Sequence, residues 1–542
     1  MNLRKRESFV RGAFMLTLAA LVSRLLGALY KPIVARIFAP FDGQAGAAGI
    51  GLTQVPLSAY QVVLAFTSVG LNVGISRLVA ERMALGDVRG ARRVFRVSLL
   101  LMAGLGLLAS VVMFVGAPWL ARLVARGAME TVPGFRATAP ALLVVSVMAA
   151  YRGLFQGFQQ MTPNAYSQII EQMVRVIAGI VLTFVVMHVT HSVPLGAAAF
   201  NFGDVLGALA GLLYLLVLAR RAGEGLWATG EEATAAEPPS AALVRETPWE
   251  LIRRILAVAG PVAISGAVVP LMMVADTFFV FQALPEPEAE YGRLTNAFMI
   301  TYLPAVFTTA IYTSILPAMA EAMAREDVHL ARKRAAQAYR MTLLLAIPAQ
   351  TGLYVLAEGI YTLLFGDPSG AVAMAAIAWA TVPIMLQQTT AGVLQGIGKI
   401  VLPVRNFMLG ALVKIVLSAL WTPAWGVRGA AYATAVGFTV AAVLNVIFVE
   451  RLLGRTLKTR GMILKPLAAS LVMAGGIALV RGPLTNLIPN VHVVTLLLIA
   501  FGGALYGIAA LLVRAVRRQD MERLPGVGRR LAAWLVRLGL LR

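Results

Sequence analysis

The stretch Val79–Phe95 reads VAERMALGDVRGARRVF, and a second stretch, Met319–Ala335, reads MAEAMAREDVHLARKRA. The second repeats the first 240 positions later, from Glu81 to Glu321. The other identical pairs are Met83/Met323, Ala84/Ala324, Asp87/Asp327, Val88/Val328, Ala91/Ala331 and Arg92/Arg332. Identity at one offset indicates an internal duplication. In a membrane protein, a duplication predicts a transporter with its binding site between the two copies.

Shorter matches extend the duplication along the chain. FRVSLLL at Phe95–Leu101 returns as YRMTLLL at Tyr339–Leu345, and LFQGF at Leu154–Phe158 returns as VLQGI at Val393–Ile397. VRV at 174–176 returns as VKI at 413–415. The last match places a basic residue at the same point of both copies.

The composition places the chain in a membrane. Of the 542 residues, 59% are hydrophobic and 13% are charged, and the mean hydropathy is +0.80. Apolar runs of about 18 residues or more cross a bilayer as helices, because backbone polar groups in lipid must be satisfied within the segment. We predict an all-α polytopic membrane protein with about fourteen transmembrane helices. The predicted spans are 13–38, 54–76, 97–118, 139–158, 166–187, 194–219, 251–281, 295–318, 341–365, 371–397, 402–421, 429–449, 463–480 and 493–513.

The net charge of +22 comes from basic residues whose distribution along the chain is typical of a membrane protein. Basic residues gather in alternate loops, including Arg77–Arg96, Arg325–Arg340 and Arg451–Lys465. Because Lys and Arg mark cytoplasmic loops, we predict that both termini are cytoplasmic. This pattern accounts for the charge without a nucleic-acid partner.

The duplication predicts five parts. Residues 1–220 form an N-lobe with spans 1–6 and residues 251–450 a C-lobe with spans 7–12, with a polar cytoplasmic linker over 221–250. Six spans separate the copies, so both six-helix lobes insert in the same direction, as in parallel-repeat transporters. Accessory spans 13 and 14 lie in 451–513, and a basic cytoplasmic tail covers 514–542.

Several other classes are disfavoured. Cysteine is absent, which excludes disulfides and thiolate metal sites. His188 and His191 alone do not complete a metal site. The sequence holds no GxxxxGK[ST] motif and no convincing group of catalytic acids in its loops. We therefore predict a transporter, not an enzyme, with no metal and no bound cofactor.

Charged residues inside the spans are the candidates for binding, because a charge at the bilayer centre costs about 2.5–3.5 kcal/mol and should face a cavity or a partner. Arg24 and Lys31 are seven residues apart in span 1 and share one helix face. Arg175 and Lys414 occupy matching positions in the two copies. Clusters of Arg and Lys bind phosphate groups, so we predict that these four cations bind an anionic substrate.

A structural role stays open for the same cations. Glu171 lies four residues before Arg175, a spacing at which the two neutralise each other. Arg24 and Lys31 have no acid within their own span, although an acid of span 6 or 7 can pair with them. Lys414 has no acidic residue one turn before or after it.

Three stretches resemble the MurJ-like and stage V sporulation protein B-like flippases of the MOP superfamily. They are SRLLGALYKP at Ser23–Pro32, FTSVGLNVGISRLVAERMALGD at Phe66–Asp87 and GVLQGIGKIVLPVRNFMLGALVK at Gly392–Lys414. The resemblance covers nearly the whole chain, including its division into twelve plus two spans. It implies two lobes of the MATE and MurJ type, together with two C-terminal helices.

The resemblance also implies a function. Such a flippase moves an undecaprenyl-pyrophosphate-linked saccharide, chiefly the peptidoglycan precursor lipid II, from the inner to the outer leaflet of the bacterial cytoplasmic membrane by alternating access. Arg24 and Lys31 would bind the head group, and the accessory helices would form a groove for the polyprenyl tail. Some members carry a basic residue in span 8, but Leu294–Met319 holds none, so Lys414 would supply the second-lobe cation. The implied partners are lipid II, membrane lipids and the machinery of cell-wall synthesis, with roles in cell shape or sporulation.

Energy coupling and cargo stay open. Family members can couple transport to a cation through acidic and amide groups, for which Asp276 in span 7 and Asn406 in span 11 are candidates, so Na⁺, H⁺ and the membrane potential are alternatives. One rival function is a flippase for another lipid-linked polysaccharide unit. Another is a MATE-type cation-coupled multidrug exporter, which is disfavoured because its pocket needs acids that attract cationic drugs.

Overall fold

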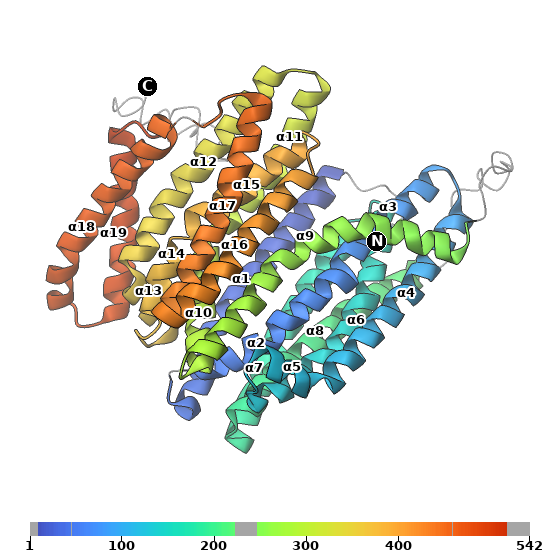
Figure 1. Ribbon diagram of the computed structural model, residues 1–542, viewed down its shortest axis with the longest axis horizontal. Coiled ribbons are helices and arrows are strands. Elements are labelled where there is room, and N and C mark those ends of the chain that lie inside the picture. Colours follow the sequence, from blue (N-terminus) through green and yellow to red (C-terminus); the bar gives the residue numbers. More distant parts are fainter. Residues whose placement is uncertain (1–8, 45, 223–245, 458, 517–542) are drawn as a thin grey trace. The chain divides into compact units, whose positions relative to one another are not determined.

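The computed structural model describes residues 9–44, 46–222, 246–457 and 459–516, and these residues are helical with short connections (Figure 1). Most of the predicted linker and of the predicted basic tail therefore lies outside the described residues. The chain separates into two compact units, Met1–Gly292 and Arg293–Arg542.

The first unit begins with a long helix, α1 (Phe9–Asp42), which holds Pro32 and Pro40. The next segment runs as α2 (Ala47–Leu64), a π-helical turn (Ala65–Val69) and α3 (Gly70–Ala84). The other helices of this unit are α4 (Val88–Val115), α5 (Ala117–Val124), α6 (Val132–Gly157), α7 (Thr162–Thr190), α8 (Val193–Ala222) and α9 (Pro248–Ala283).

Helix α10 (Pro287–Tyr302) crosses the boundary between the units. The second unit continues with α11 (Ala305–Ala324), α12 (Val328–Val355), α13 (Ala357–Phe365), α14 (Ala371–Ala378), α15 (Thr381–Gly396), α16 (Val401–Trp425), α17 (Val427–Leu453), α18 (Lys465–Leu487) and α19 (Val491–Leu512). A π-helical turn, Arg460–Leu464, leads directly into α18.

The helical membrane fold is confirmed, but the count of fourteen spans is not. Ten helices of the described residues are long and apolar enough to cross a membrane, or up to thirteen if each bent helix pair is one span. The pairs are α10 with α11, α12 with α13 and α14 with α15, bent by 47°, 76° and 41°. Helix α1, which contains the first predicted span, is 34 residues long but is not among these thirteen.

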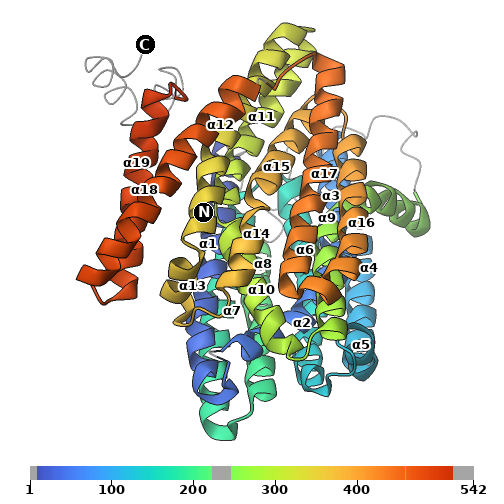
Figure 2. The same ribbon diagram turned by 60° about the vertical axis from the view of Figure 1, so that its left-hand side comes forward.

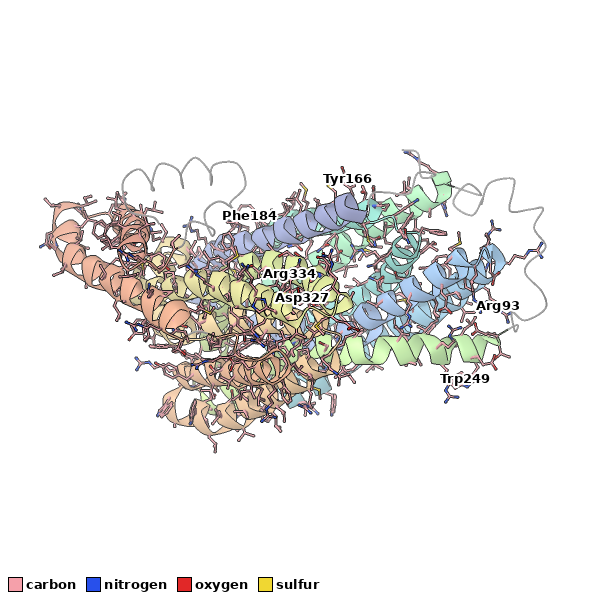
Figure 3. The ribbon with its side chains drawn as sticks, turned by 90° about the horizontal axis from the view of Figure 1, so that it is seen from above. Arg93, Tyr166, Phe184, Trp249, Asp327 and Arg334 are labelled. Atoms are coloured by element: carbon pink, nitrogen blue, oxygen red, sulfur yellow. The ribbon has the colours of Figure 1, made fainter. Side chains whose placement is uncertain are left out.

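The duplication appears as the same turn at two places. Before α4, the Asp87 backbone N–H donates to the Arg82 carbonyl at 2.9 Å, and the Asp87 side chain accepts from Gly90 N–H at 2.7 Å. Before α12, the Asp327 backbone N–H donates to the Ala322 carbonyl at 3.0 Å, and the Asp327 side chain caps the helix in the same way. Asp327 is labelled in Figure 3. An aspartate at this position satisfies an N–H group that the helix leaves without a partner. The repeated motif LGDV/REDV therefore encodes one helix–turn–helix unit twice.

A second turn repeats at the ends of α6 and α15. Gln160 N–H donates to the Phe155 carbonyl and Lys399 N–H to the Leu394 carbonyl, both at 2.9 Å. The residue before each donor is left-handed, with φ of +59° at Gln159 and +81° at Gly398. The backbone of this turn is kept although only one copy uses glycine there.

Helix α9 packs within the first unit, although the sequence repeat assigns it to the second copy. Leu251, Ile255 and Ala259 of α9 are buried in one core with residues of α3, α4 and α6. Along the chain, the division between the compact units therefore falls between Gly292 and Arg293, whereas the repeat boundary was predicted at 221–250. The two criteria differ because the first describes packing and the second ancestry. The domain division from the repeat stays a prediction.

Helices α18 and α19 form a pair in the second unit, visible side by side in Figures 1 and 2. They cover the predicted spans 13 and 14. Their shared core with the end of α12 contains Leu356, Met473, Ile477, Val494 and Leu498. Burial of these apolar side chains holds the pair on the second unit.

Candidate functional site

Lys31 lies on the buried face of α1. Its side chain is 6% exposed, and Val34, Ala35 and Phe38 on the same face are buried completely or almost completely. Pro32 follows directly and has no N–H, so an ideal helical bond to the carbonyl four residues earlier is missing there. The amine of Lys31 is therefore held inside the first unit, next to an interruption in the backbone hydrogen bonds of α1.

Three helices bring charges together beside Lys31. Arg175 on α7 pairs with Asp204 on α8, with 2.8 Å between Nε and Oδ1. The guanidinium carbon of Arg175 lies 5.9 Å from the centre of the Tyr30 ring on α1. Arg175 is also close enough to Lys31 for the two positive charges to repel each other. The predicted candidates Lys31 and Arg175 therefore belong to one cluster.

Glycines allow α8 to approach α7 closely enough for this pairing. A Cβ atom at Gly203 would lie 2.8 Å from the Arg175 carbonyl oxygen, and one at Gly207 would lie 2.7 Å from the Arg175 Cβ. Both distances are shorter than a side chain tolerates. The spacing of four residues places both glycines on the α8 face that meets α7.

The predicted neutralisation of Arg175 by Glu171 is wrong. Glu171 pairs with Arg152 on α6, with 2.7 Å between Oε2 and Nη2. Arg152 also donates to the Ser167 hydroxyl at 2.9 Å. Because α6 and α8 both place charges against α7, each charge of α7 takes its partner from a neighbouring helix. The sequence argument missed Arg152 because it lies near the end of span 4; its only signal was a charge next to the repeated LFQGF motif.

The cluster carries an excess positive charge. Lys31, Arg152 and Arg175 are cations, whereas Glu171 and Asp204 are the carboxylates that pair with the two arginines. The charges of these five side chains add up to one positive charge. A buried surplus of positive charge attracts an anion. The backbone of Arg24 lies in α1, but its side chain is outside the described set, so its role stays a prediction.

The second copy places Lys414 in the same packing arrangement. Lys414 on α16 is completely buried, and a Cβ atom at Gly437 of α17 would lie 2.6 Å from the Lys414 Cβ. In the first copy, Gly207 makes the matching contact with Arg175, and Asp204 lies three residues before that glycine; in the second copy, Thr434 lies three residues before Gly437. Helix α17 has no acidic residue before Glu450. The two copies therefore share the glycine contact but not the carboxylate.

Asn406 belongs to a buried polar chain within the second unit. Its Nδ2 donates to Asn445 Oδ1 at 3.0 Å, and Asn445 Nδ2 donates to the Thr390 hydroxyl at 3.1 Å. Both asparagines are completely buried. Within the described residues, Asn406 Oδ1 has no hydrogen-bond partner. An amide oxygen with unused lone pairs can accept a proton donor or a hard cation.

Asp276, the other predicted coupling residue, is half-buried on α9 in the first unit. The hydroxyl of its neighbour Thr277 lies 3.4 Å from the Ser58 hydroxyl and donates to the Met273 carbonyl at 3.0 Å. Asn406 belongs to the second unit. Within the residues that the structure describes, no group of three or more His, Cys, Asp or Glu is placed to hold a metal ion.

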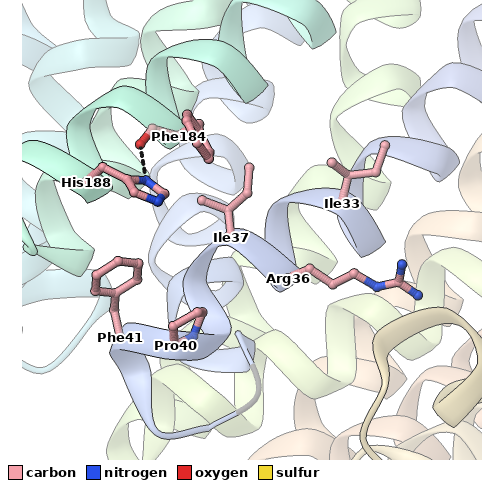
Figure 4. A pocket seen from close by; sticks show the side chains of 7 residues that line it. All are labelled: Ile33, Arg36, Ile37, Pro40, Phe41, Phe184 and His188. Atoms are coloured by element: carbon pink, nitrogen blue, oxygen red, sulfur yellow. Dashed lines mark hydrogen bonds between the residues drawn. The ribbon is translucent and has the colours of Figure 1, made fainter.

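A cavity of about 420 Å³ opens on the other side of α1. It is lined by Ile33, Arg36, Ile37, Pro40, Phe41, Phe184 and His188 (Figure 4). His188 Nδ1 lies 2.8 Å from the Phe184 carbonyl oxygen. The helical period places the α1 residues of this cavity away from the face of Lys31. The cavity is therefore separate from the Lys31 cluster.

A second charge cluster joins the end of α3 to the start of α9. Glu246 accepts from Arg82 and from Arg254, both at 2.5 Å, and Arg254 also pairs with Glu81 at 3.0 Å. Partial burial acts to raise the pKa of Glu246, but the hydrogen bonds and charges of Arg254 and Arg82 outweigh it and leave the pKa below its ordinary value. The same bonds raise the pKa of Arg254. This cluster ties the end of the linker to the first unit.

Comparison with known proteins identifies the family. The model of the polysaccharide biosynthesis protein family matches residues 9–323, which is more than half of the chain. The chain belongs to this family. The model of the MatE family matches residues 261–420. The two matches together run from residue 9 to residue 420, which covers nearly all of the first copy and most of the second.

Full-length relatives support the same placement. The lipid II flippase MurJ of Bacillus subtilis is 25% identical over 97% of this chain and 99% of that protein. Stage V sporulation protein B of the same organism is 26% identical with the same coverage. A solved structure of the lipid II flippase MurJ in an inward closed conformation has a TM-score of 0.71 over 92% of this chain and 99% of that chain, at 16% identity. The fold is thus that of a MurJ-type protein, and these relatives are transporters rather than enzymes.

Proposed function

We propose that this protein is a flippase that moves an undecaprenyl-pyrophosphate-linked saccharide from the inner to the outer leaflet of the bacterial cytoplasmic membrane, and that lipid II is its cargo. Membership of the polysaccharide biosynthesis protein family supports a lipid-linked saccharide as the class of cargo. The observation that carries the proposal is the buried Lys31 next to the Arg175–Asp204 pair. A pyrophosphate is an anion that such a cationic centre accepts.

The physical problem of flipping explains why a buried cation is needed. A pyrophosphate with attached sugars cannot cross about 30 Å of hydrocarbon alone, because an unpaired charge in that medium is very costly. Lys31 replaces part of the hydration that the head group loses. The polyprenyl chain is apolar and stays in lipid, with the α18–α19 pair as its proposed guide. The two copies alternate access to the head group from either side of the membrane.

The energy source in this proposal is the membrane potential, assisted by a coupled cation. An inside-negative potential favours outward movement of an anion by about 2.3 kcal/mol per charge for each 100 mV. Asp276 and Asn406 are the proposed coupling residues for Na⁺ or H⁺. The choice of Asn406 is supported by its buried Oδ1, which has no hydrogen-bond partner among the described residues. We place both termini in the cytoplasm because the basic loops on that side follow the positive-inside pattern.

One observation favours a second candidate. The MatE model matches residues 261–420, so export of small cationic molecules is the alternative function. A pocket for cations needs carboxylates in excess, whereas the Lys31 cluster has more cations than carboxylates. Flipping of another lipid-linked glycan, with a role in sporulation or another envelope process, differs from the proposal only in the saccharide.

Lipid II exposure at the cell surface tests the proposal. Cells depleted of their own flippase would express either the wild type or Lys31→Ala, with membrane insertion of both checked by fractionation. We expect the wild type to restore exposure and Lys31→Ala to fail. If the inserted wild type leaves lipid II inside, the cargo is not lipid II, and an assay of another undecaprenyl-linked glycan or of drug export decides between the alternatives.

A further inference from the structure

Internal bonds hold the first part of the loop that follows α17, as far as Leu457. Glu450 Oε1 accepts from the backbone N–H groups of Thr456 and Leu457, at 3.2 and 3.0 Å. Gly454 is left-handed, with φ of +80°, and the Arg332 guanidinium lies against it. Thr456 is completely buried, and Met462 belongs to the core of the second unit. The exposed side chains that follow α17 therefore start, at Arg455, from a backbone that these bonds hold.

Those exposed side chains line a pocket of about 570 Å³. Its lining residues are Arg455, Thr459, Arg460 and Leu464. Two guanidinium groups and a hydroxyl can all donate hydrogen bonds, and none of them carries negative charge. The pocket is therefore built to receive an anion with several acceptor oxygens.

Little in the chain around this pocket neutralises its charge. From Arg451 to Arg518 the sequence has no acidic residue, and Glu450 is engaged by the loop backbone. Among the described residues, neither Arg455 nor Arg460 takes part in an ion pair. Nearby, the Lys465 amine donates to the Arg514 carbonyl at 3.1 Å, so the start of α18 lies next to the end of α19.

The pocket lies where a membrane span begins. Arg460 is the first residue of the candidate span Arg460–Leu487. Leu464, Leu467 and Leu471 are exposed, and their spacing of three and four residues places them on one face of α18. An apolar strip thus leads from the two arginines into the part of the helix that faces hydrocarbon. A membrane lipid has a charged head group, which would contact the two arginines at the water boundary, and a hydrocarbon chain, which would lie along the apolar strip.

We propose that Arg455 and Arg460 bind the phosphate group of a membrane lipid, whose hydrocarbon chain lies along Leu464, Leu467 and Leu471. The planar guanidinium groups can each offer two parallel N–H donors to phosphate oxygens, and Thr459 adds its hydroxyl. Basic pockets at the ends of transmembrane helices are where anionic head groups bind. The site is separate from the Lys31 cluster, and it does not depend on the proposed function.

Lipid titration of the full-length protein in phosphatidylcholine nanodiscs tests this site. One series adds phosphatidylglycerol and another adds undecaprenyl pyrophosphate, with bound lipid counted by native mass spectrometry. The test variant is Arg455→Gln/Arg460→Gln. The control is Arg451→Gln, which removes an exposed arginine of the same loop region that stacks on Phe448 and does not line the pocket.

We expect binding to weaken about fivefold per arginine, so about 25-fold in the double variant, and by less than about twofold in Arg451→Gln. The proposal is overturned if the double variant binds both lipids as tightly as the wild type, or if the control loses as much. Unchanged thermal unfolding in plain phosphatidylcholine excludes misfolding as the cause of weaker binding.

The two lipid series separate the sources of the phosphate. Preference for undecaprenyl pyrophosphate would make the pocket a waiting position for cargo, which rests on the proposed function. Equal binding, or preference for phosphatidylglycerol, would make it a site for a lipid of the surrounding leaflet. Normal flipping by Lys31→Ala would contradict the proposed function, but it would not bear on the proposed lipid site at Arg455 and Arg460.

Discussion

The two copies of the duplication share helix contacts but carry different charged residues at the matching positions. In the first copy, Arg152 pairs with Glu171 and Arg175 with Asp204. The repeats quoted above match positions 152, 171 and 175 with 391, 410 and 414, and the shared glycine contact matches Gly207 with Gly437, which places 204 opposite 434. The second copy holds Ala391, Gly410, Lys414 and Thr434 at these places. Four charges in one copy thus correspond to one in the other.

This difference separates the residues that both copies retained from those that changed after the duplication. Both copies keep the capping aspartates of their helix turns and the glycine that touches the basic residue, because these positions determine how the helices pack. The polar residues diverged. Ser167 donates to the Gly211 carbonyl, whereas Asn406, at the matching position of the second copy, donates to Asn445 Oδ1. Packing is therefore shared, and we expect the electrostatic roles of the copies to differ.

The largest effect on stability is expected from Asp204→Asn. Removing this carboxylate leaves the Arg175 guanidinium without its charge partner in a mostly buried position, which costs about 3 kcal/mol. Thermal unfolding in detergent would measure the loss. The double variant Arg175→Met/Asp204→Leu should recover most of it, because no charge is then left over; an equal loss in the double variant would contradict the pairing.

Breaking the polar chain of the second copy should cost somewhat less. Asn445→Ala removes hydrogen bonds with Asn406 and Thr390 and leaves both of those groups buried, at an expected cost of about 2 kcal/mol. Unfolding at several Na⁺ concentrations is the measurement. If Asn406 takes part in Na⁺ coupling, Na⁺ stabilises the wild type and not Asn445→Ala. Equal stabilisation of both proteins would contradict that role.

Lys414→Met tests whether the single charge of the second copy serves transport. Methionine fills a similar volume without the charge, and we expect about tenfold slower flipping, equivalent to about 1.4 kcal/mol. Lys414→Arg is the matched control and should retain more activity. Normal flipping by Lys414→Met would give Lys414 a structural role.

The smallest effect is expected at the α3–α9 cluster. Glu246→Gln should lower stability by about 1 kcal/mol, because it weakens charged hydrogen bonds with Arg82 and Arg254. The corresponding cluster of the second copy is more exposed, so Glu321→Gln should cost less than about 0.5 kcal/mol. An equal loss in both variants would contradict this difference.

The same cluster predicts a pH dependence. The folded pKa of Glu246 is lowered, so its stabilising contribution is complete above the ordinary carboxyl pKa and is lost as the pH falls through the folded value. The stability gap between the wild type and Glu246→Gln should therefore stay constant near neutral pH and shrink in acid. A stability gap that widens in acid would contradict a lowered pKa of Glu246 in the folded protein.

Periodicity and repetition in the sequence were sufficient for the fold, because hydrophobic runs and capped turns are local signals. Thirteen of the predicted spans correspond to candidate spans or bent pairs of the structure. The placement of α9 in the first unit was not predictable, since its buried face depends on which helices surround it.

The candidate site was predictable only in part. The match of Arg175 with Lys414 located two basic positions, and Lys31 is buried, but the binding role of all three stays a prediction. The partners of the charges were not predictable. Arg152 and Asp204 reach α7 from neighbouring helices, and no spacing within one helix reveals such contacts.

Reconstituted flipping is the measurement that tests the central claim most directly. Proteoliposomes would contain purified protein and a lipid-linked saccharide, with the saccharide that reaches the outer face detected by an added hydrolase. We predict transfer by the wild type, substantial transfer by Lys31→Arg, and a loss of more than about a hundredfold in Lys31→Ala, as expected when a buried charge loses its role. Transfer by Lys31→Ala at the rate of the wild type would contradict the claim that a buried cationic centre carries the head group.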